Sequence, residues 1–140
     1  MKKVVLFFAA ALAFASCSTK LTEEVVATYP DGKTQKVQYC NSKGDCVKEV
    51  ELYETGKVKM EGPMKGEKRD GEWTAYFEDG RVQSHGYFKD GLRTGTAEVF
   101  YSNGNKCEEG FYNKGSHCGK WKFYDEQGNL IKEVDYGECE

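Results

Sequence analysis

The sequence contains little of the chemistry on which most enzymes depend. Only two histidines occur in 140 residues, His85 and His117. His117 adjoins Cys118, but neighbours along a strand point to opposite faces, so the two do not form a Cys–His dyad. There is no P-loop, no H-E-x-x-H, no C-x-x-C and no Ser-His-Asp order with a nucleophile elbow. We therefore expect no enzyme, no cofactor and no metal site. The alternative left open is a glycosidase-like carboxylate pair among the many acidic residues.

The sequence also lacks a long hydrophobic run and an amphipathic helix. Its one apolar stretch, residues 4–15, is about a dozen residues long and follows Lys2 and Lys3. A membrane-spanning helix needs about 20 apolar residues, so this stretch is typical of a targeting segment. We expect a signal peptide over residues 1–16.

The end of this segment, A-F-A-S-C-S, resembles a bacterial lipobox, in which Cys17 becomes the lipidated N-terminus after cleavage. Attached acyl chains would then hold the protein on a membrane of the cell envelope. Two other interpretations stay open: a secretory signal cut elsewhere, and an uncleaved anchor. The domain organisation predicted on this basis is a signal peptide (1–16), a lipidated Cys with its tether (17–28) and a folded domain (29–140).

Acidic residues outnumber basic residues once the signal peptide is set aside. Its removal takes away two lysines and leaves 18 basic against 23 acidic residues, a net charge of about −5. An acidic chain is repelled by nucleic acids and by anionic headgroups. We therefore expect no nucleic-acid partner and no attraction to anionic lipid.

What the sequence does have is glycine at a fixed period. Three series of glycines recur at one common spacing, and aromatic residues follow the same period. Trp73 and Trp121 are two periods apart, with Ala97 between them. The glycine series are Gly32, Gly56, Gly80, Gly104 and Gly128; Gly62, Gly86 and Gly110; and Gly71, Gly95 and Gly119.

A period of about 24 residues fits two strands and two turns, and it is too short for common helical repeats. The clearest unit, residues 71–91, contains two Asp-Gly turns between alternating apolar runs. Asp-Gly favours hairpins because Gly accepts the positive φ that primed turns require. We predict an all-β fold, in which antiparallel β-hairpins from 24-residue repeats form one curved, extended sheet.

The pattern G-x-W-x-x-Y-x-x-x-G, followed by G-x-Y/F-x-x-G, resembles the MORN repeat, and most closely the bacterial YwqK-type variant. The resemblance covers roughly residues 29–136 and is strongest after residue 56. The first unit departs from it, with Cys40 and Cys46 in place of the G-x-W opening, and a later unit has Ala97 in place of Trp. The resemblance implies a β-hairpin array and carries the label of an antitoxin.

Two faces of the predicted sheet carry aromatic residues. Trp73 and Trp121 mark one face, and a second column lies on the opposite face: Tyr76, Phe100 and Tyr124. This column is either a packed ladder or a partly exposed stripe that binds a partner. We treat these three residues as the candidate partner-binding site.

The cysteines predict disulfides, since an exported protein meets an oxidising compartment. Cys40 and Cys46 flank a five-residue loop, which would place them opposite each other. Counting back from the turn at Gly128 brings Cys118 close to Cys139. Cys107 would then be free.

Three functions remain in competition. The first is a lipid-anchored, non-catalytic interaction or scaffold module for an envelope protein. The second, implied by the family label, is an antitoxin or immunity-like inhibitor that covers a toxin. The third is a structural protein that contacts membrane lipid or cell wall. An edge strand could also pair with another copy, so self-association is possible.

Overall fold

The computed structural model describes residues 20–139, in which all regular structure is β-strand. The expected signal peptide and Cys17 lie outside the described residues. The eleven strands are β1 (Thr22–Thr28), β2 (Thr34–Cys40), β3 (Cys46–Leu52), β4 (Val58–Lys65), β5 (Lys68–Arg69), β6 (Gly71–Tyr76), β7 (Val82–Lys89), β8 (Leu92–Phe100), β9 (Lys106–Asn113), β10 (Ser116–Tyr124) and β11 (Leu130–Asp135). Within the described range, no helix has the length and apolar character needed to cross a bilayer.

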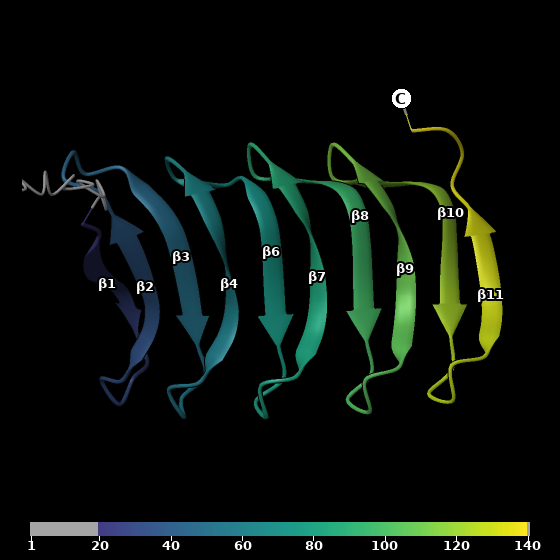
Figure 1. The fold of residues 1–140 in the computed structure, drawn as a ribbon, viewed down its shortest axis with the longest axis horizontal. Helices are drawn as coiled ribbons and strands as arrows, with labels where there is room; N and C mark the ends of the chain where they lie inside the picture. The colour runs from purple at the N-terminus through teal and green to yellow at the C-terminus, as the bar shows by residue number, and fades with distance from the viewer. Residues whose placement is uncertain (1–19, 140) are drawn as a thin grey trace, which may run out of the picture.

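The strands form one open antiparallel sheet in which each strand pairs with its neighbours in the chain. Only the short strand β5 lies off this path, and it pairs with β4. Figure 1 shows bowed strands side by side along the long axis, with β1 and β11 at the two ends. The predicted all-β hairpin array is confirmed.

The sheet begins earlier than the sequence pattern predicts. Thr22–Thr28 falls within the expected tether, but it forms β1 and pairs with β2 from Thr22↔Cys40 to Thr28↔Thr34. Its side chains are mostly exposed, and Val25 and Val26 break the alternation that marks a half-buried strand. The backbone pairing with β2 decides its structure instead. Residues 22–28, which were expected to be part of the tether, therefore belong to the sheet.

Five turns at one end of the sheet repeat with the period of the sequence. In the turn after β6, the amide of Phe77 donates to the carbonyl of Arg81, and the amide of Gly80 donates to the carbonyl of Phe77. Only Gly80 has positive φ there, and a register shift lies between Ala75 and Tyr76. These features define a type I turn closed by a glycine bulge. The prediction of a primed turn at Asp79-Gly80 is therefore wrong, because a primed type I turn needs positive φ at two successive residues.

The primed turn does occur at the opposite end of the sheet. Asp90 and Gly91 both have positive φ, 49° and 88°, between the paired residues Lys89 and Leu92. Lys114 and Gly115 repeat this geometry one period later. The prediction of a primed turn at Asp90-Gly91 is confirmed.

Both predicted disulfides are present. Cys40 pairs in register with Cys46, with Cα atoms 3.8 Å apart. Cys118 bonds to Cys139, with Cα atoms 5.1 Å apart, and ties the chain beyond β11 to β10. Of the cysteines between residues 20 and 139, Cys107 alone is free, and it is half-buried.

Candidate partner-binding surface

The strand register sorts side chains onto two faces, because paired residues share a face and successive residues alternate. Trp73 pairs with Gly86, and Gly86 with Ala97. We call the face that carries Trp73, Ala97 and Trp121 the tryptophan face. The face that carries the predicted site residues Tyr76, Phe100 and Tyr124 is called the stripe face.

The structure brings the three stripe residues onto one face at successive repeats, but none of them is fully exposed. Tyr76 donates its hydroxyl to Glu61, and Tyr124 donates to Glu109 at the equivalent position two repeats later. In the repeat between them, Phe100 has no hydroxyl and stacks on His85, with centroids 5.9 Å apart. His85 occupies the place of the two glutamates, so both members of the pair have changed together.

Charged residues surround this column and lock it in place. Lys48 lies 2.7 Å from Glu61, and this contact, followed by the hydrogen bond from Tyr76, holds the pKa of Glu61 below its usual value. Burial, followed by the hydrogen bond to Glu61, raises the pKa of the Tyr76 hydroxyl. The column is therefore partly a packed ladder, as one of the two sequence interpretations stated.

The same arrangement recurs around Glu109. Lys106 bridges Glu109 and Glu98, and the hydrogen bonds to these two carboxylates raise the pKa of Lys106. His85 Nε2 also lies 2.7 Å from a carboxylate oxygen of Glu98. A chain of polar and charged contacts thus crosses β7, β8 and β9 on the stripe face.

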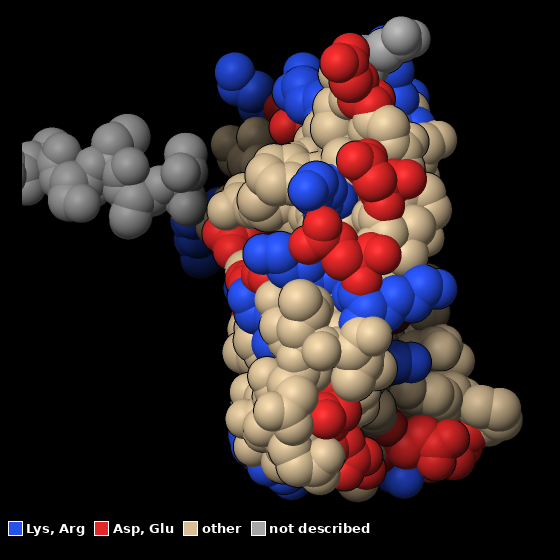
Figure 2. Space-filling view, turned by 90° about the vertical axis from the view of Figure 1, so that its right-hand side faces the viewer, with Lys and Arg blue, Asp and Glu red and all other residues tan. Residues whose placement is uncertain are grey.

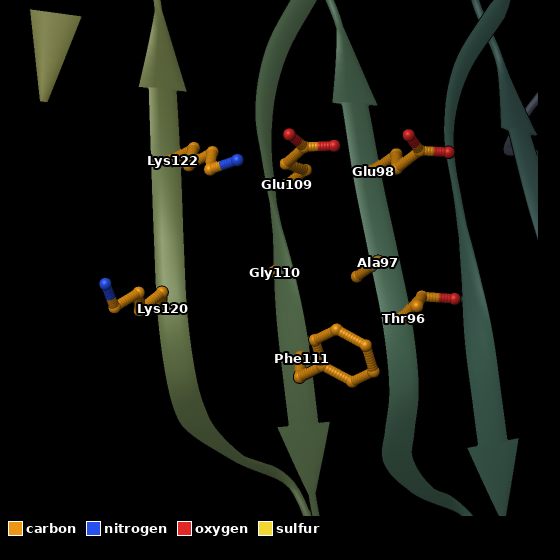
Figure 3. A pocket seen from close by; sticks show the side chains of 8 residues that line it. All are labelled: Thr96, Ala97, Glu98, Glu109, Gly110, Phe111, Lys120 and Lys122. Carbon is orange, nitrogen blue, oxygen red and sulfur yellow. The ribbon is translucent and has the colours of Figure 1, made fainter. Parts of the chain in front are cut away.

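Beside this column, two of the hollows on the stripe face lie at equivalent positions of different repeats. The C-terminal trough has a volume of about 410 Å³, and Figure 3 shows its side chains in two rows across β8, β9 and β10. One row is Glu98, Glu109 and Lys122, the other is Thr96, Phe111 and Lys120, and Ala97 and Gly110 lie between the rows.

The N-terminal trough has a volume of about 350 Å³ and is built from equivalent positions two repeats earlier. Gly62 takes the place of Gly110, Glu61 that of Glu109, and Pro63 that of Phe111. The charges differ, because Glu72 and Thr74 stand where the C-terminal trough has Lys120 and Lys122. The troughs therefore share a shape but not an electrostatic character.

The most accessible aromatic rings on the stripe face are ones that sequence reasoning missed. Tyr87 is 38% exposed and Phe111 is 49% exposed. They lie one period apart and pair with Glu72 and Thr96, which places them on the stripe face. Their shared period was a signal available in the sequence, but the period alone does not show which aromatic column is left open.

Few of the clusters of titratable side chains are arranged for metal binding or for catalysis. Glu24, Cys40 and Cys46 bring ligand-type atoms within 4.8 Å of one another, but both sulfurs belong to a disulfide and cannot act as thiolates. His117 packs between Tyr112 and Tyr136 on the tryptophan face and stacks on the Tyr136 ring. This cluster packs side chains and does not resemble a nucleophile–base pair.

Charge of both signs is present at the β11 end. Figure 2 shows Lys and Arg interspersed with Asp and Glu on this side of the molecule. Lys120, for example, lies 3.3 Å from Glu133 on β11. A partner at this end would meet alternating charges.

The sequence model of a protein family, the MORN repeat variant, matches three segments of the chain, residues 69–90, 93–114 and 118–137. The chain carries three MORN-type repeats. They contain the aromatic residues of the sheet from β6 onward, whereas the hairpins β1–β2 and β3–β4 lie before the first MORN match. No curated protein matches the sequence.

Two solved structures resemble the chain weakly. A crystal structure of TarM is 12% identical, with a TM-score of 0.33, and the match covers 81% of this chain and 19% of that one. A crystal structure of the GtfA/B complex bound to UDP and GlcNAc is 11% identical, with a TM-score of 0.32, covering 76% of this chain and 21% of that one. The chain thus spans about a fifth of the length of these proteins, and the likeness carries no argument about activity.

Proposed function

We propose that the protein is a lipid-anchored, non-catalytic interaction module of the bacterial cell envelope. Cys17 would carry the lipid, and the MORN-type repeat sheet would bind a partner protein. The two disulfides support export, because such bonds persist in oxidising compartments.

The C-terminal trough is the observation that carries this proposal. It is lined by a half-exposed aromatic ring, Phe111, and by two lysines and two glutamates. Aromatic rings anchor protein interfaces, and charges around them select the partner. Lys106 and Tyr124 already hold Glu109 in place, so one wall is preorganised before any partner arrives.

The test is site-directed photo-crosslinking in intact cells. A photoreactive phenylalanine analogue replaces Phe111 in the C-terminal trough or, as a matched control, Leu92, which is 52% exposed beside the Asp90-Gly91 turn. Each version is made with Cys17 and with Cys17→Ser. We expect one specific adduct from position 111, absent from position 92, and strongly reduced with Cys17→Ser.

Identical adducts from both positions, or none from position 111, would show that the trough is not a binding surface. An adduct that survives Cys17→Ser unchanged would remove the anchor from the proposal. If the captured protein is a toxin that acts outside the cytoplasm, the module serves as an immunity-like inhibitor.

A further inference from the structure

The tryptophan face contains the same indole site in two repeats. Trp73 lies over Gly62, and its Nε1 donates to the carbonyl of Pro63 at 2.9 Å. Trp121 lies over Gly110, and its Nε1 donates to the carbonyl of Phe111 at 3.0 Å. Each tryptophan is almost fully buried. The site therefore consists of a glycine floor and a carbonyl acceptor on the neighbouring strand.

A cation or an imidazole covers each indole. The guanidinium of Arg69 lies 4.1 Å from the centre of the Trp73 ring. His117, which stands two periods after Arg69, meets Trp121 edge-on, with centroids 4.3 Å apart. Positively charged groups are attracted to the electron-rich face of an indole, so Arg69 is a favourable cover for the ring.

The middle repeat has every part of this site except the indole. Ala97 replaces the tryptophan, while Gly86 keeps the floor and Tyr87 supplies the carbonyl that corresponds to those of Pro63 and Phe111. The side-chain atom nearest to a Cβ on Gly86 would be the Cβ of Ala97, at 3.5 Å, where the two sister glycines face an indole.

The cover of the middle site is also present. Arg93 corresponds to Arg69 and His117, and its guanidinium lies 5.4 Å from the ring of Phe88 and 5.2 Å from that of Tyr112. Arg93 is exposed and makes no ion pair among residues 20–139. Ala97 and Gly86 are both buried, and the hollow beside Arg93, which Gly86 shares with Trp73 of the preceding site, has a volume of only about 20 Å³. An entering ring must therefore displace Arg93 from Phe88 and Tyr112, and no ion pair among the described residues opposes this.

We propose that this middle position is a binding site for the tryptophan side chain of a partner protein. The partner's indole would lie over Gly86 between Phe88 and Tyr112, donate its N–H to the carbonyl of Tyr87, and be covered by Arg93. The ligand follows from the two sister sites, in which the chain supplies an indole of its own. The site is on the face opposite the troughs and does not depend on them.

Indole fits these groups better than the other aromatic side chains. A phenylalanine ring has no donor for the Tyr87 carbonyl, and a tyrosine hydroxyl extends from the ring end instead of its side. Trp also gives the strongest attraction to a guanidinium. These complementarities make a tryptophan the specific occupant.

The structure offers two blocking variants. Gly86→Ala is tolerated by the middle site itself but places a methyl group where the indole must lie, since a Cβ at either sister glycine would come closer than 3.0 Å to the ring. Ala97→Trp supplies the indole in cis and fills the site. Both are expected to keep the repeat pattern of the sheet, and circular dichroism checks that they fold.

The experiment measures binding of a blocked Gly-fluorotryptophan-Gly peptide to the full chain in lipid nanodiscs by fluorine NMR, with protein-free nanodiscs as the blank. We expect saturable binding to the native protein that is at least about tenfold weaker for both variants and for a fluorophenylalanine peptide. Absence of saturable binding to the native protein overturns the proposal, as does undiminished binding by either variant or equal binding of the phenylalanine peptide. Photo-crosslinking from position 111 is read separately, so each proposal can fail alone.

Discussion

The indole of Trp121 lies so close over Gly110 that a Cβ on this glycine would come within 3.0 Å of the ring. The same relationship joins Trp73 to Gly62 two repeats earlier. Neither glycine has a positive φ, so close packing requires them, not an unusual backbone conformation.

Substitution of the three equivalent glycines by alanine should therefore have unequal effects. Gly62→Ala and Gly110→Ala should each lower the free energy of unfolding by about 1–3 kcal/mol, because the methyl group displaces a buried indole. Gly86→Ala should be nearly neutral, since its Cβ meets Ala97 at an ordinary 3.5 Å. Urea denaturation of the three variants measures this, and equal losses would contradict the packing described.

Tyrosines in the turns join neighbouring hairpins. Tyr53 donates its hydroxyl to the carbonyl of Tyr76, and Tyr101 donates to that of Tyr124, at 2.7 and 2.8 Å. Tyr101→Phe should lower the free energy of unfolding by about 0.5–1.5 kcal/mol, because the carbonyl loses its partner. The reverse substitution is also possible, because Phe77 occupies the turn position equivalent to Tyr53 and Tyr101 but has no hydroxyl. Phe77→Tyr should stabilise the protein, and a loss in thermal denaturation would show that the repeat is not equivalent there.

The two disulfides should contribute unequally. Cys118–Cys139 closes a sequence separation of 21 residues and Cys40–Cys46 one of 6. Chain-entropy estimates give about 3 kcal/mol for the longer loop and about 1 kcal/mol less for the shorter one. Urea denaturation of the two double-alanine variants, with Cys107→Ala as the control for a free thiol, should show the larger loss for Cys118 and Cys139. The reverse order would refute this account.

Acid should weaken the fold partly through Glu109. Hydrogen bonds from Lys106 and then Tyr124 hold the pKa of Glu109 below its usual value of 4.5. A carboxyl with a depressed folded-state pKa stabilises the fold above its unfolded pKa, and this contribution is lost as the pH falls. Between about pH 5 and pH 3, the native protein should therefore lose stability more steeply than Glu109→Gln. Glu108→Gln removes the same charge from the tryptophan face and is the control. Parallel curves for native and Glu109→Gln protein would exclude the role of this cluster.

Local sequence patterns predicted part of the candidate surface, namely which face its residues occupy, but not the contacts that these residues make. Alternation along the strands was enough to place Tyr76, Phe100 and Tyr124 on one face. It did not show that the hydroxyls of Tyr76 and Tyr124 are bound to Glu61 and Glu109, or that His85 stacks on Phe100. Those contacts join residues on different strands, and the register between strands sets them. The same register leaves Tyr87 and Phe111 as the open rings of this face.

By itself, the sequence determined the all-β class, the hairpin order and both disulfides. Each follows from local rules: glycine at a fixed period accepts turn geometry, and alternation assigns faces. Only the tertiary structure decided that Thr22–Thr28 joins the sheet, that Gly80 closes a bulged turn, and that Trp73 and Trp121 cover glycines of the neighbouring strand. The repeat pattern of the sequence showed that Ala97 stands at a position where the neighbouring repeats have tryptophan. Only the packing between strands showed that a tryptophan at position 97 would lie over Gly86. An indole site of this kind is built from residues on neighbouring strands, and a local sequence pattern does not show which of these residues lie side by side.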